Sequence, residues 1–334
     1  MYLTITVDTE EDNWGEFVRP SYTVENLRRL PRLQELFARY GVRPTYLVSY
    51  PVATSVDGVD ILGRYREEGA CEIGTHPHPC NTPPIDEERT EFNSYICNLP
   101  SRLQFKKIET LTNAIESNFG VRPTTYRSGR WGFNEEIARH LIRLGYTVDT
   151  SVFPVWDWNP GPDFRRFSHA PFVYQMASGA GASGSLLEVP ATVDFLQSRR
   201  ELATSAFHSI QRIPLGFKVL GGLRKLGVLN RVCLSPEVAE VTDMIRLAQQ
   251  LAERGAHVLN FFLHSPTLLE GCTPFARTPA DVTAFMARIE RFLGFARSAG
   301  YTPVTMSELT ADRLGASAVR MIGGTESATL SRTL

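Results

Sequence analysis

The sequence predicts an α/β protein in which one distorted (β/α) barrel occupies nearly the whole chain. Short apolar runs typical of strands alternate with helix-like segments almost to the C-terminus. This alternation predicts a parallel sheet, for which a closed barrel is the economical form. The chain has 334 residues and 43% hydrophobic content, which is enough for one large core. A single barrel with insertions fits this length.

The expected elements of the first half begin with an apolar, β-branched run at residues 1–7, which is typical of a strand. Residues 23–40 carry apolar side chains at helical spacing, so we expect a helix that Pro31 kinks and Gly41 ends. The same reasoning predicts strands at 45–48, 71–74, 124–127 and 146–149, and helices at 60–68, 101–119 and 134–144.

The second half continues the alternation with an expected strand at residues 186–193. Ser235, Pro236 and Glu237 combine a cap, a proline for the first helical position and an early acid, so we expect a helix to begin there and to end at Gly255. The remaining expected elements are a strand at 258–263, a helix opening at 278–279 and a final strand at 301–305.

Two segments depart from the barrel pattern. Residues 195–234 form an apolar insertion that we expect to be helical, and residues 316–334, rich in Ser, Thr, Gly and Ala, are an expected disordered tail after a barrel domain of 1–315. The insertion either covers the barrel or meets an anionic membrane surface, because interfacial segments combine apolar and basic residues. Residues 202–236 contain no acid and five basic residues, Arg212, Lys218, Arg224, Lys225 and Arg231.

Composition excludes several classes of protein. The net charge of -1 provides no general field for nucleic acid. Five cysteines without a CxxC pair argue against a disulfide scaffold and a structural zinc knuckle, and favour a reducing compartment. The first residues resemble a strand and not a signal peptide, and no apolar window is long enough to span a membrane. We therefore expect a cytoplasmic protein that is at most peripheral to the inner face of the membrane.

Polar side chains follow several of the expected strands. Because catalytic groups of parallel barrels lie at the carboxyl ends of strands, these residues are candidates for one site. Carboxylates and imidazoles that converge in this way suit a divalent metal, and Zn²⁺ above all, with an open position for water. The strand ends supply Asp8 and Glu10, His76 and His78, Arg127, Asp149, and His264.

Four short motifs occur at the expected strand ends. They are 6–10 (TVDTE), 72–76 (EIGTH), 126–132 (YRSGRWG) and 263–265 (LHS). In these motifs and their order, the chain resembles the NodB-homology polysaccharide deacetylases, which form carbohydrate esterase family 4. The resemblance covers about residues 1–310. A further segment, 145–154 (GYTVDTSVFP), is similar to the branch found in lipopolysaccharide and exopolysaccharide assembly.

The resemblance implies a role for each matching residue. Asp8 would be the general base that takes a proton from metal-bound water, and Arg127 would keep it ionised. Glu10 would be the metal carboxylate, since residues i and i+2 of a strand share a face, and His76 the first metal histidine. His264 would be the general acid. The resemblance gives Asp149 a weaker role near the site.

One position departs from the family. The family usually shows two histidines four residues apart, but the residue four after His76 is Cys80. Either Cys80 supplies a thiolate or His78 supplies the second imidazole. We favour His78, because an H-x-H pair on an extended segment can place both rings on one ion and an open cysteine there is prone to oxidation. Asn81 would complete the shell.

The expected activity is hydrolysis of an N-acetyl or N-formyl amide on a sugar, either nucleotide-linked or lipid-linked, in cell-surface polysaccharide or lipopolysaccharide biosynthesis. Arg130, Trp131 and Asn81 are expected at the sugar. Trp156 and Trp158 are further stacking candidates, although packing explains the tryptophans equally well. Two other functions remain open. One is hydrolysis of a non-sugar C–N amide on the same fold, and the other is a sugar-binding barrel that has lost catalysis.

Overall fold

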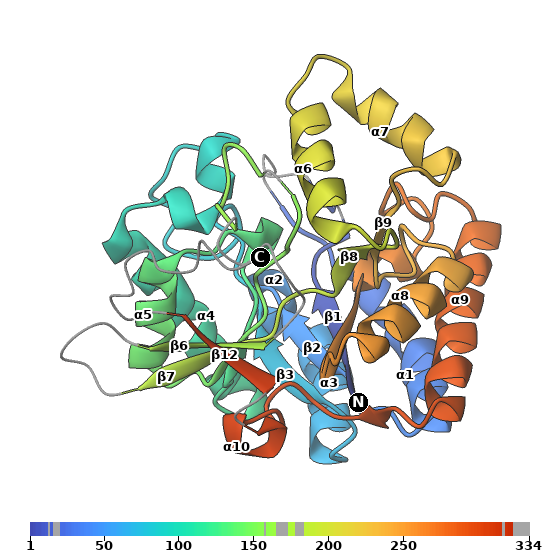
Figure 1. Ribbon diagram of the computed structural model, residues 1–334. Coiled ribbons are helices and arrows are strands. Elements are labelled where there is room, and N and C mark those ends of the chain that lie inside the picture. Colours follow the sequence, from blue (N-terminus) through green and yellow to red (C-terminus); the bar gives the residue numbers. More distant parts are fainter. Residues whose placement is uncertain are drawn as a thin grey trace.

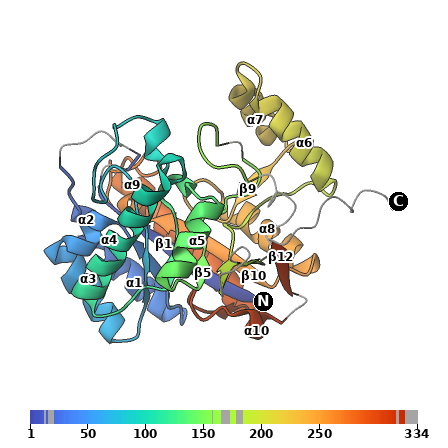
Figure 2. The same ribbon diagram turned by 90° about the vertical axis from the view of Figure 1, so that its left-hand side faces the viewer.

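The computed structural model describes residues 1–12, 14–15, 21–156, 158–164, 173–177, 184–315 and 318–322. A curled sheet lies at the centre and helices surround it (Figures 1 and 2). The strands of this sheet are β1 (Tyr2–Thr9), β2 (Thr45–Val48), β3 (Glu72–Thr75), β4 (Thr125–Tyr126), β5 (Val148–Asp149), β6 (Val173–Ala177), β7 (Ser185–Glu188), β10 (Val258–His264), β11 (Thr302–Pro303) and β12 (Val319–Ile322).

The sheet has the order β10-β1-β2-β3-β4-β5-β7-β6-β12, with β11 beside β1. All of these pairs are parallel except β6 with β7. The strand ladder does not join β7 to β10 directly. Thr192 N donates to Asn260 O at 3.4 Å and Phe262 N donates to Leu234 O at 3.1 Å, and these bonds bridge the gap. The predicted distorted (β/α) barrel is confirmed.

The helices pack their apolar faces on the sheet, as amphipathic helices of α/β folds do. Figure 2 shows α3, α4 and α5 in front of the strands. On the opposite flank, Phe292 of the last long helix stacks on Phe261 of β10 with ring centroids 5.0 Å apart. The helices are η1 (Glu25–Arg29), α1 (Leu30–Arg39), α2 (Tyr50–Thr54), α3 (Val56–Glu67), η2 (Phe92–Ser94), η3 (Ile96–Asn98), α4 (Ser101–Phe119), η4 (Gly129–Trp131), α5 (Glu135–Leu144), α8 (Val241–Glu253), η6 (Ser265–Leu268), α9 (Pro279–Ser298) and α10 (Ala311–Leu314).

Most expected elements occur within a few residues of their predicted bounds, but one helix start was wrong. We expected a helix to open at 235–237, whereas α8 begins at Val241. The carboxylate of Glu237 accepts hydrogen bonds from His264 and Thr267, so tertiary contacts hold this residue outside the helix. The expected strand 186–193 is also divided, because β7 ends at Glu188 and a new strand begins at Val193.

The insertion is helical, as predicted. It consists of β8 (Val193–Phe195), α6 (Arg200–Gln211), α7 (Gly216–Lys225) and β9 (Arg231–Cys233), and β8 pairs with β9 in antiparallel fashion. The two helices form a hairpin, α6–α7, that rises above the barrel (Figure 1). A small core of its own, with Phe195, Phe207 and Leu220, holds the hairpin against Val155.

The expectation of a disordered tail was wrong for the residues that form β12. Val319–Ile322 pair in parallel with β6, because edge strand β6 offers unpaired backbone groups to an extended segment. Residues 323–334 lie outside the described part of the chain. Among the described residues, no helix is both long enough and apolar enough to cross a membrane.

Candidate active site

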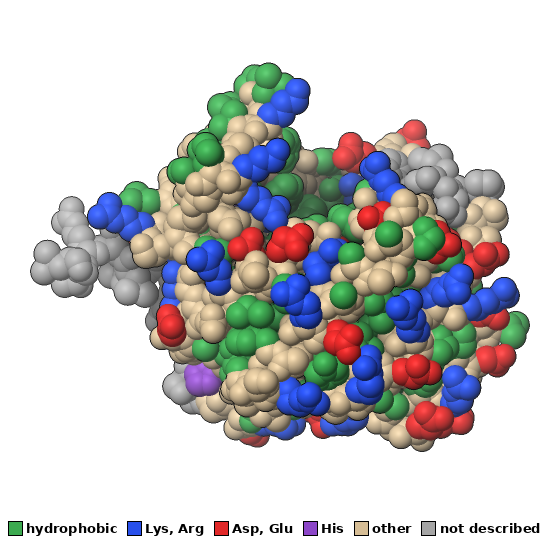
Figure 3. All heavy atoms as spheres, turned by 90° about the vertical axis from the view of Figure 1, so that its right-hand side faces the viewer, with side chains coloured by type: hydrophobic (Ala, Val, Ile, Leu, Met, Phe, Trp, Pro, Cys, Tyr) green, Lys and Arg blue, Asp and Glu red, His purple; other side chains and the backbone are tan. Residues whose placement is uncertain are grey.

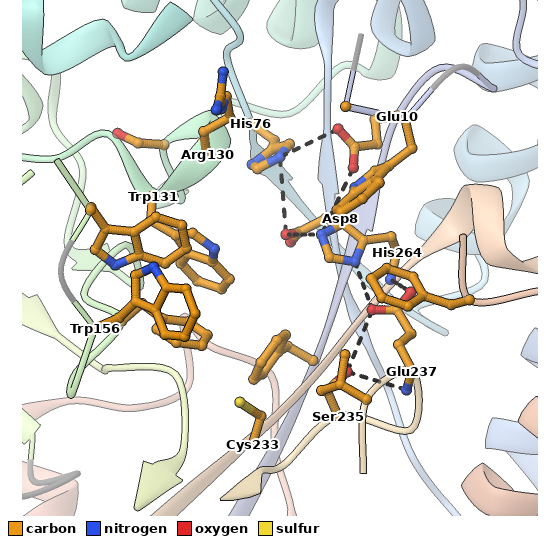
Figure 4. Close-up of a pocket in the computed structure, with 18 of the residues that line it drawn as sticks. Asp8, Glu10, His76, Arg130, Trp131, Trp156, Cys233, Ser235, Glu237 and His264 are labelled. Carbon is orange, nitrogen blue, oxygen red and sulfur yellow. Dashed lines mark hydrogen bonds and ion pairs between the residues drawn. The ribbon is translucent and has the colours of Figure 1, made fainter. Parts of the chain in front are cut away.

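A cavity of about 640 Å³ opens at the carboxyl ends of β1, β3 and β10. Figure 4 shows its two sides, with Trp131 and Trp156 facing the carboxylates and histidines across the open space. One side is lined by Asp8, Glu10, His76, His78, Glu237 and His264, and the other by Trp131, Phe153, Trp156, Trp158 and Phe262.

Glu10, His76 and His78 form a group that could hold a metal ion. His78 Nε2 lies 2.9 Å from Glu10 Oε2 and 3.1 Å from His76 Nε2, and His76 Nε2 lies 3.8 Å from Glu10 Oε2. Two ligands of one tetrahedral zinc ion, each about 2.1 Å from it, are roughly 3.4 Å apart. The separations bracket this value, so the three side chains fit one divalent ion.

His76 has the protonation state that a metal ligand needs. Its Nδ1 donates to the carbonyl oxygen of Arg127 at 3.0 Å, so its Nε2 carries the lone pair that faces Glu10 and His78. Burial lowers the pKa of His76 to about 4, which keeps the ring neutral. Burial also disfavours the His78 cation, but the hydrogen bond and charge of Glu10 raise the pKa of that ring.

Asp8 is an ionised carboxylate with one oxygen fixed and one available. Arg127 donates to its Oδ1 at 2.5 Å, while its Oδ2 lies 4.0 Å from His76 Nε2. Burial opposes ionisation, but the charge of Arg127 and of the nearby histidines lowers the pKa of Asp8. Arg127 is itself completely buried and donates to Thr6 Oγ1 at 2.9 Å and Thr150 O at 3.1 Å. The pair therefore presents Asp8 Oδ2 to the metal group.

His264 is paired with a second carboxylate. Glu237 Oε2 accepts from His264 Nδ1 at 2.8 Å, and Glu237 Oε1 accepts from the His264 backbone N at 3.1 Å. Burial opposes the charged ring, but Glu237, Asp8 and Glu10 raise the pKa of His264 to about 10. His264 Nε2, 3.6 Å from Asp8 Oδ2, therefore carries a proton toward the site. Trp14 packs against the ring at 5.2 Å.

Glu237 is a residue of the site that its sequence context did not predict. Its place after Ser235 and Pro236 is typical of an early helix acid, yet it follows β9 as Glu10 follows β1. A polar side chain after an apolar strand is the signal that predicts the other site residues, and Glu237 carries the same signal. The composition of residues 231–234, which resembles the rest of the insertion, hides that strand.

Asp149 does not line the cavity. Ser151 Oγ donates to Asp149 Oδ1 at 2.6 Å and accepts from Ser128 N at 2.8 Å, so Asp149 fixes the loop that follows β4. Its neighbour across the sheet is Glu188 of β7. Both carboxyl groups are fully buried, and burial raises the pKa of each. The contacts indicate a positioning role for Asp149, which is the kind of weaker role near the site that the resemblance implied, and not direct contact with the cavity.

Cys80 and Asn81 lie outside the metal group. Burial raises the pKa of the Cys80 thiol to about 11, which disfavours a thiolate, and its carbonyl oxygen accepts from Tyr22 at 2.9 Å. Asn81 Nδ2 donates to Glu11 Oε1 at 2.8 Å. Neither residue lines the cavity, so the geometry favours His78 over Cys80 and gives Asn81 a supporting position.

Arg130 and Trp131 are on the cavity wall, as are Trp156 and Trp158. Arg130 and Trp131 have φ values of 54° and 61°, in the left-handed region that non-glycine residues seldom adopt. Arg130 donates to Tyr95 Oη at 3.1 Å, which anchors its side chain at the rim. Trp131 packs between the guanidinium of Arg127, 4.9 Å away, and Phe153.

Known proteins resemble this chain in fold. No family model and no curated protein matches its sequence. Among solved structures, a "putative glycoside hydrolase/deacetylase" from Parabacteroides distasonis has a TM-score of 0.59 at 13% identity, over 92% of this chain and 69% of that one. The 4-alpha-glucanotransferase from Thermococcus litoralis has a TM-score of 0.52 at 13% identity, over 92% and 40%. The Xyl-CE4 domain of a multidomain xylanase, from the hindgut metagenome of Trinervitermes trinervoides, has a TM-score of 0.44 at 13% identity, over 93% and 90%.

The first two likenesses establish the fold alone. Because a glucanotransferase and a glycoside hydrolase/deacetylase share it, the fold does not select a reaction. The chemistry depends on the residues that line the cavity.

Proposed function

We propose that this protein is a divalent-metal-dependent hydrolase that removes an N-acyl group from a sugar. The observation that carries the proposal is the arrangement around Glu10, His76 and His78. An ionised carboxylate, Asp8, and a protonated imidazole, His264, both lie beside this group, with His264 Nε2 3.6 Å from Asp8 Oδ2. A base and an acid next to a metal group suit the hydrolysis of an unactivated amide.

A divalent ion held by Glu10, His76 and His78, for which we propose Zn²⁺, would polarise the acyl carbonyl and acidify an attacking water. Asp8 Oδ2 accepts the proton of that water while Arg127 holds Oδ1 in place. Oxygen adds to the carbonyl carbon and the C–N bond breaks. His264 Nε2 donates a proton to the departing nitrogen, and Glu237 stabilises the imidazolium before this transfer. The products are the free amine and the carboxylic acid.

Two features favour an amide on a sugar as the substrate. An amine leaves poorly unless it is protonated, and the raised pKa of His264 provides an acid for this step. The opposite wall presents Trp131, Trp156 and Trp158, whose flat apolar faces suit a pyranose ring. The resemblance of residues 145–154 supports a place in cell-surface polysaccharide or lipopolysaccharide assembly.

Metal analysis and acyl release test the proposal together. The purified protein should carry about one divalent ion per chain by elemental mass spectrometry. It should also release acetate or formate from at least one member of a panel of N-acylated amino sugars, sugar nucleotides and lipid-linked sugars. A metal-free protein that releases neither acid would instead be the sugar-binding barrel without catalysis. Activity confined to small non-sugar amides would establish the other alternative.

We further propose that the α6–α7 hairpin rests on an anionic lipid bilayer. Large apolar side chains are exposed there, and three basic residues, Arg212, Lys218 and Lys225, lie among them. Figure 3 shows hydrophobic side chains at the tip of the hairpin and basic ones along its flank. Apolar burial and attraction to anionic head groups add in such segments. The exposed apolar residues are Leu202, Ile213, Leu215, Phe217, Val219, Leu226 and Val228.

Vesicle binding tests this surface. The protein should bind vesicles of phosphatidylglycerol and phosphatidylcholine at low salt, and pure phosphatidylcholine much less. Replacing Lys218 and Lys225 by Gln should weaken binding roughly thirtyfold, at about 1 kcal/mol per charge. The same change at Lys106 and Arg139, which are exposed on α4 and α5, is the matched control and should have little effect. Equal binding to neutral and anionic vesicles, or none to either, would make the hairpin a structural cover.

A further inference from the structure

Two arginines line the cavity on the side formed by the insertion. Arg231 lies on β9, and Arg224 lies in the last turn of α7. Cys233, Ser235 and Glu237 follow Arg231 at alternate positions and line the same cavity. Figure 4 shows these three residues along one segment that leads to His264. Arg231 therefore lies further along the segment that carries the acid partner.

The guanidinium of Arg231 is surrounded by aromatic rings. It lies 4.3 Å from the ring centroid of Trp156, 5.1 Å from that of Phe207 and 5.8 Å from that of Phe153. Its hydrogen bond to protein is a long one, from Nη1 to the carbonyl oxygen of Val155 at 3.5 Å. Within the described part of the chain, no carboxylate forms an ion pair with it.

Two fully buried charges in the described part of the chain are compensated. Arg127 is paired with Asp8, and the carboxylate of Asp194 accepts from both Arg200 and Arg254. Removing a cation from water, even in part, is costly without an anion beside it, so proteins usually supply a partner. For the half-buried Arg231, burial lowers the pKa and the positive charge of Arg224 lowers it further.

The stacking geometry leaves Arg231 able to bind an anion. Aromatic contact occupies the face of a guanidinium, whereas its N–H groups point outward in its plane. Two of these N–H groups can donate in parallel to two oxygens of a phosphate, and arginine is the side chain preferred for this interaction. Arg224 adds a second positive charge, and its Nη2 donates to the carbonyl oxygen of Val238 at 3.0 Å, which holds the side chain toward the cavity.

The position of this pair separates it from the metal group. Arg231 and Ser235 are four residues apart, which corresponds to roughly 13 Å along an extended chain. A phosphate on Arg231 would therefore lie away from the scissile amide, with the sugar ring between them along the tryptophan wall. This spacing suits a phosphate ester carried by the same sugar that carries the acyl group.

We propose that Arg231 and Arg224 form an anion subsite that binds a phosphate group of the substrate. The substrate class is thus an N-acylated amino sugar joined to phosphate, whether as a sugar nucleotide or as a lipid-linked phosphosugar. The description of the ligand as a substrate rests on the proposed function. Binding of the phosphate itself does not.

Calorimetry with two sugars that cannot be hydrolysed tests the subsite. Glucosamine 1-phosphate and methyl glucosaminide share the ring and the amine, and they differ in the phosphate. The metal-loaded protein should bind glucosamine 1-phosphate about tenfold to a hundredfold more tightly than methyl glucosaminide. This range corresponds to one hydrogen bond to a charged group. Arg231→Gln should abolish this preference, and Arg224→Gln should reduce it. Lys218→Gln, on the exposed side of α7, should preserve it.

Equal affinities for the two sugars in the wild type, or a preference that survives Arg231→Gln, would overturn the proposal. If Arg231→Gln lowers the melting temperature too far for calorimetry, Arg224→Gln decides in its place. UDP-glucosamine and a short-chain polyprenyl phosphate glucosamine then distinguish a sugar nucleotide from a lipid-linked phosphosugar as the substrate. The ligand that resembles the physiological substrate should bind more tightly, and its affinity should depend on Arg231. Acyl release from a neutral N-acyl glycoside is measured separately, so failure of the subsite leaves the proposed reaction intact.

Discussion

The second imidazole ligand can be tested by comparing His78→Ala with Cys80→Ser. Structural zinc binding is worth about 10–16 kcal/mol over four ligands, so each ligand contributes about 3 kcal/mol, or somewhat more than a hundredfold in affinity. His78 Nε2 lies 2.9 Å from Glu10 Oε2 and 3.1 Å from His76 Nε2, within the metal group. We expect His78→Ala to weaken Zn²⁺ binding by at least a hundredfold. Cys80→Ser should change it less than threefold.

Competition with a chromophoric chelator measures both affinities, and the cobalt-substituted protein gives an independent spectroscopic test. A thiolate ligand adds an intense near-ultraviolet charge-transfer band, whereas nitrogen and oxygen ligands do not. The raised pKa of the Cys80 thiol, about 11 because of burial, predicts that this band is missing. A charge-transfer band that vanishes in Cys80→Ser, or full affinity in His78→Ala, would refute the assignment of His78.

Three further perturbations separate catalysis, metal binding and stability. Asp8→Asn should retain the metal and reduce turnover about a hundredfold or more, the usual contribution of a general base; activity within a few-fold of wild type would remove Asp8 from the mechanism. His264→Ala should also reduce turnover while elemental analysis shows unchanged metal, and loss of the metal would instead make His264 a ligand. Glu188→Gln should become more stable relative to wild type as the pH rises. Burial raises the pKa of Glu188 well above its ordinary value, so the stability that this carboxyl contributes is complete below its unfolded pKa of about 4.3 and falls by up to about 1.4 kcal/mol per pH unit above it. Urea unfolding of both proteins at pH 5 and pH 8 measures the effect, and an unchanged difference between them would contradict it.

Local sequence patterns predicted much of the fold and part of the site. The side chains of a strand alternate between the two faces of the sheet. Asp8 and Glu10, two residues apart at the end of β1, were therefore expected on the same face. Parallel strands bring their carboxyl ends to one edge, which places His76 and His264 near them. These inferences need no knowledge of which distant strands are neighbours.

The residues that were missed or misplaced depend on pairing between distant segments. Glu237 follows an apolar strand, but its local sequence also has the pattern of a helix start, and the approach of His264, 27 residues later, decides between the two interpretations. Asp149 lies at the end of a strand, as Asp8 does. However, β5 contains only two residues, which is too few for the sequence pattern to show on which face of the sheet the Asp149 side chain lies. β12 pairs with β6 across more than 140 residues, and its composition gave no sign of a strand.

Backbone strain around the cavity supports the proposal that the tryptophan wall binds a ligand. Arg130, Trp131 and Val155 have φ values of 54°, 61° and 60°, and each non-glycine residue in this region costs about 1–3 kcal/mol. Val155 is β-branched, for which the conformation is least favourable. The strain orients side chains that a relaxed backbone would direct elsewhere, because Trp131 lines the cavity and the carbonyl of Val155 meets Arg231. An ordinary packing surface gives no reason to maintain three such residues near Arg231, for which the described part of the chain supplies no carboxylate partner. The proposed binding of a sugar between the metal group and Arg231 gives such a reason. A rigid wall is already ordered when the protein folds, so binding the sugar does not require the loss of conformational freedom in the site.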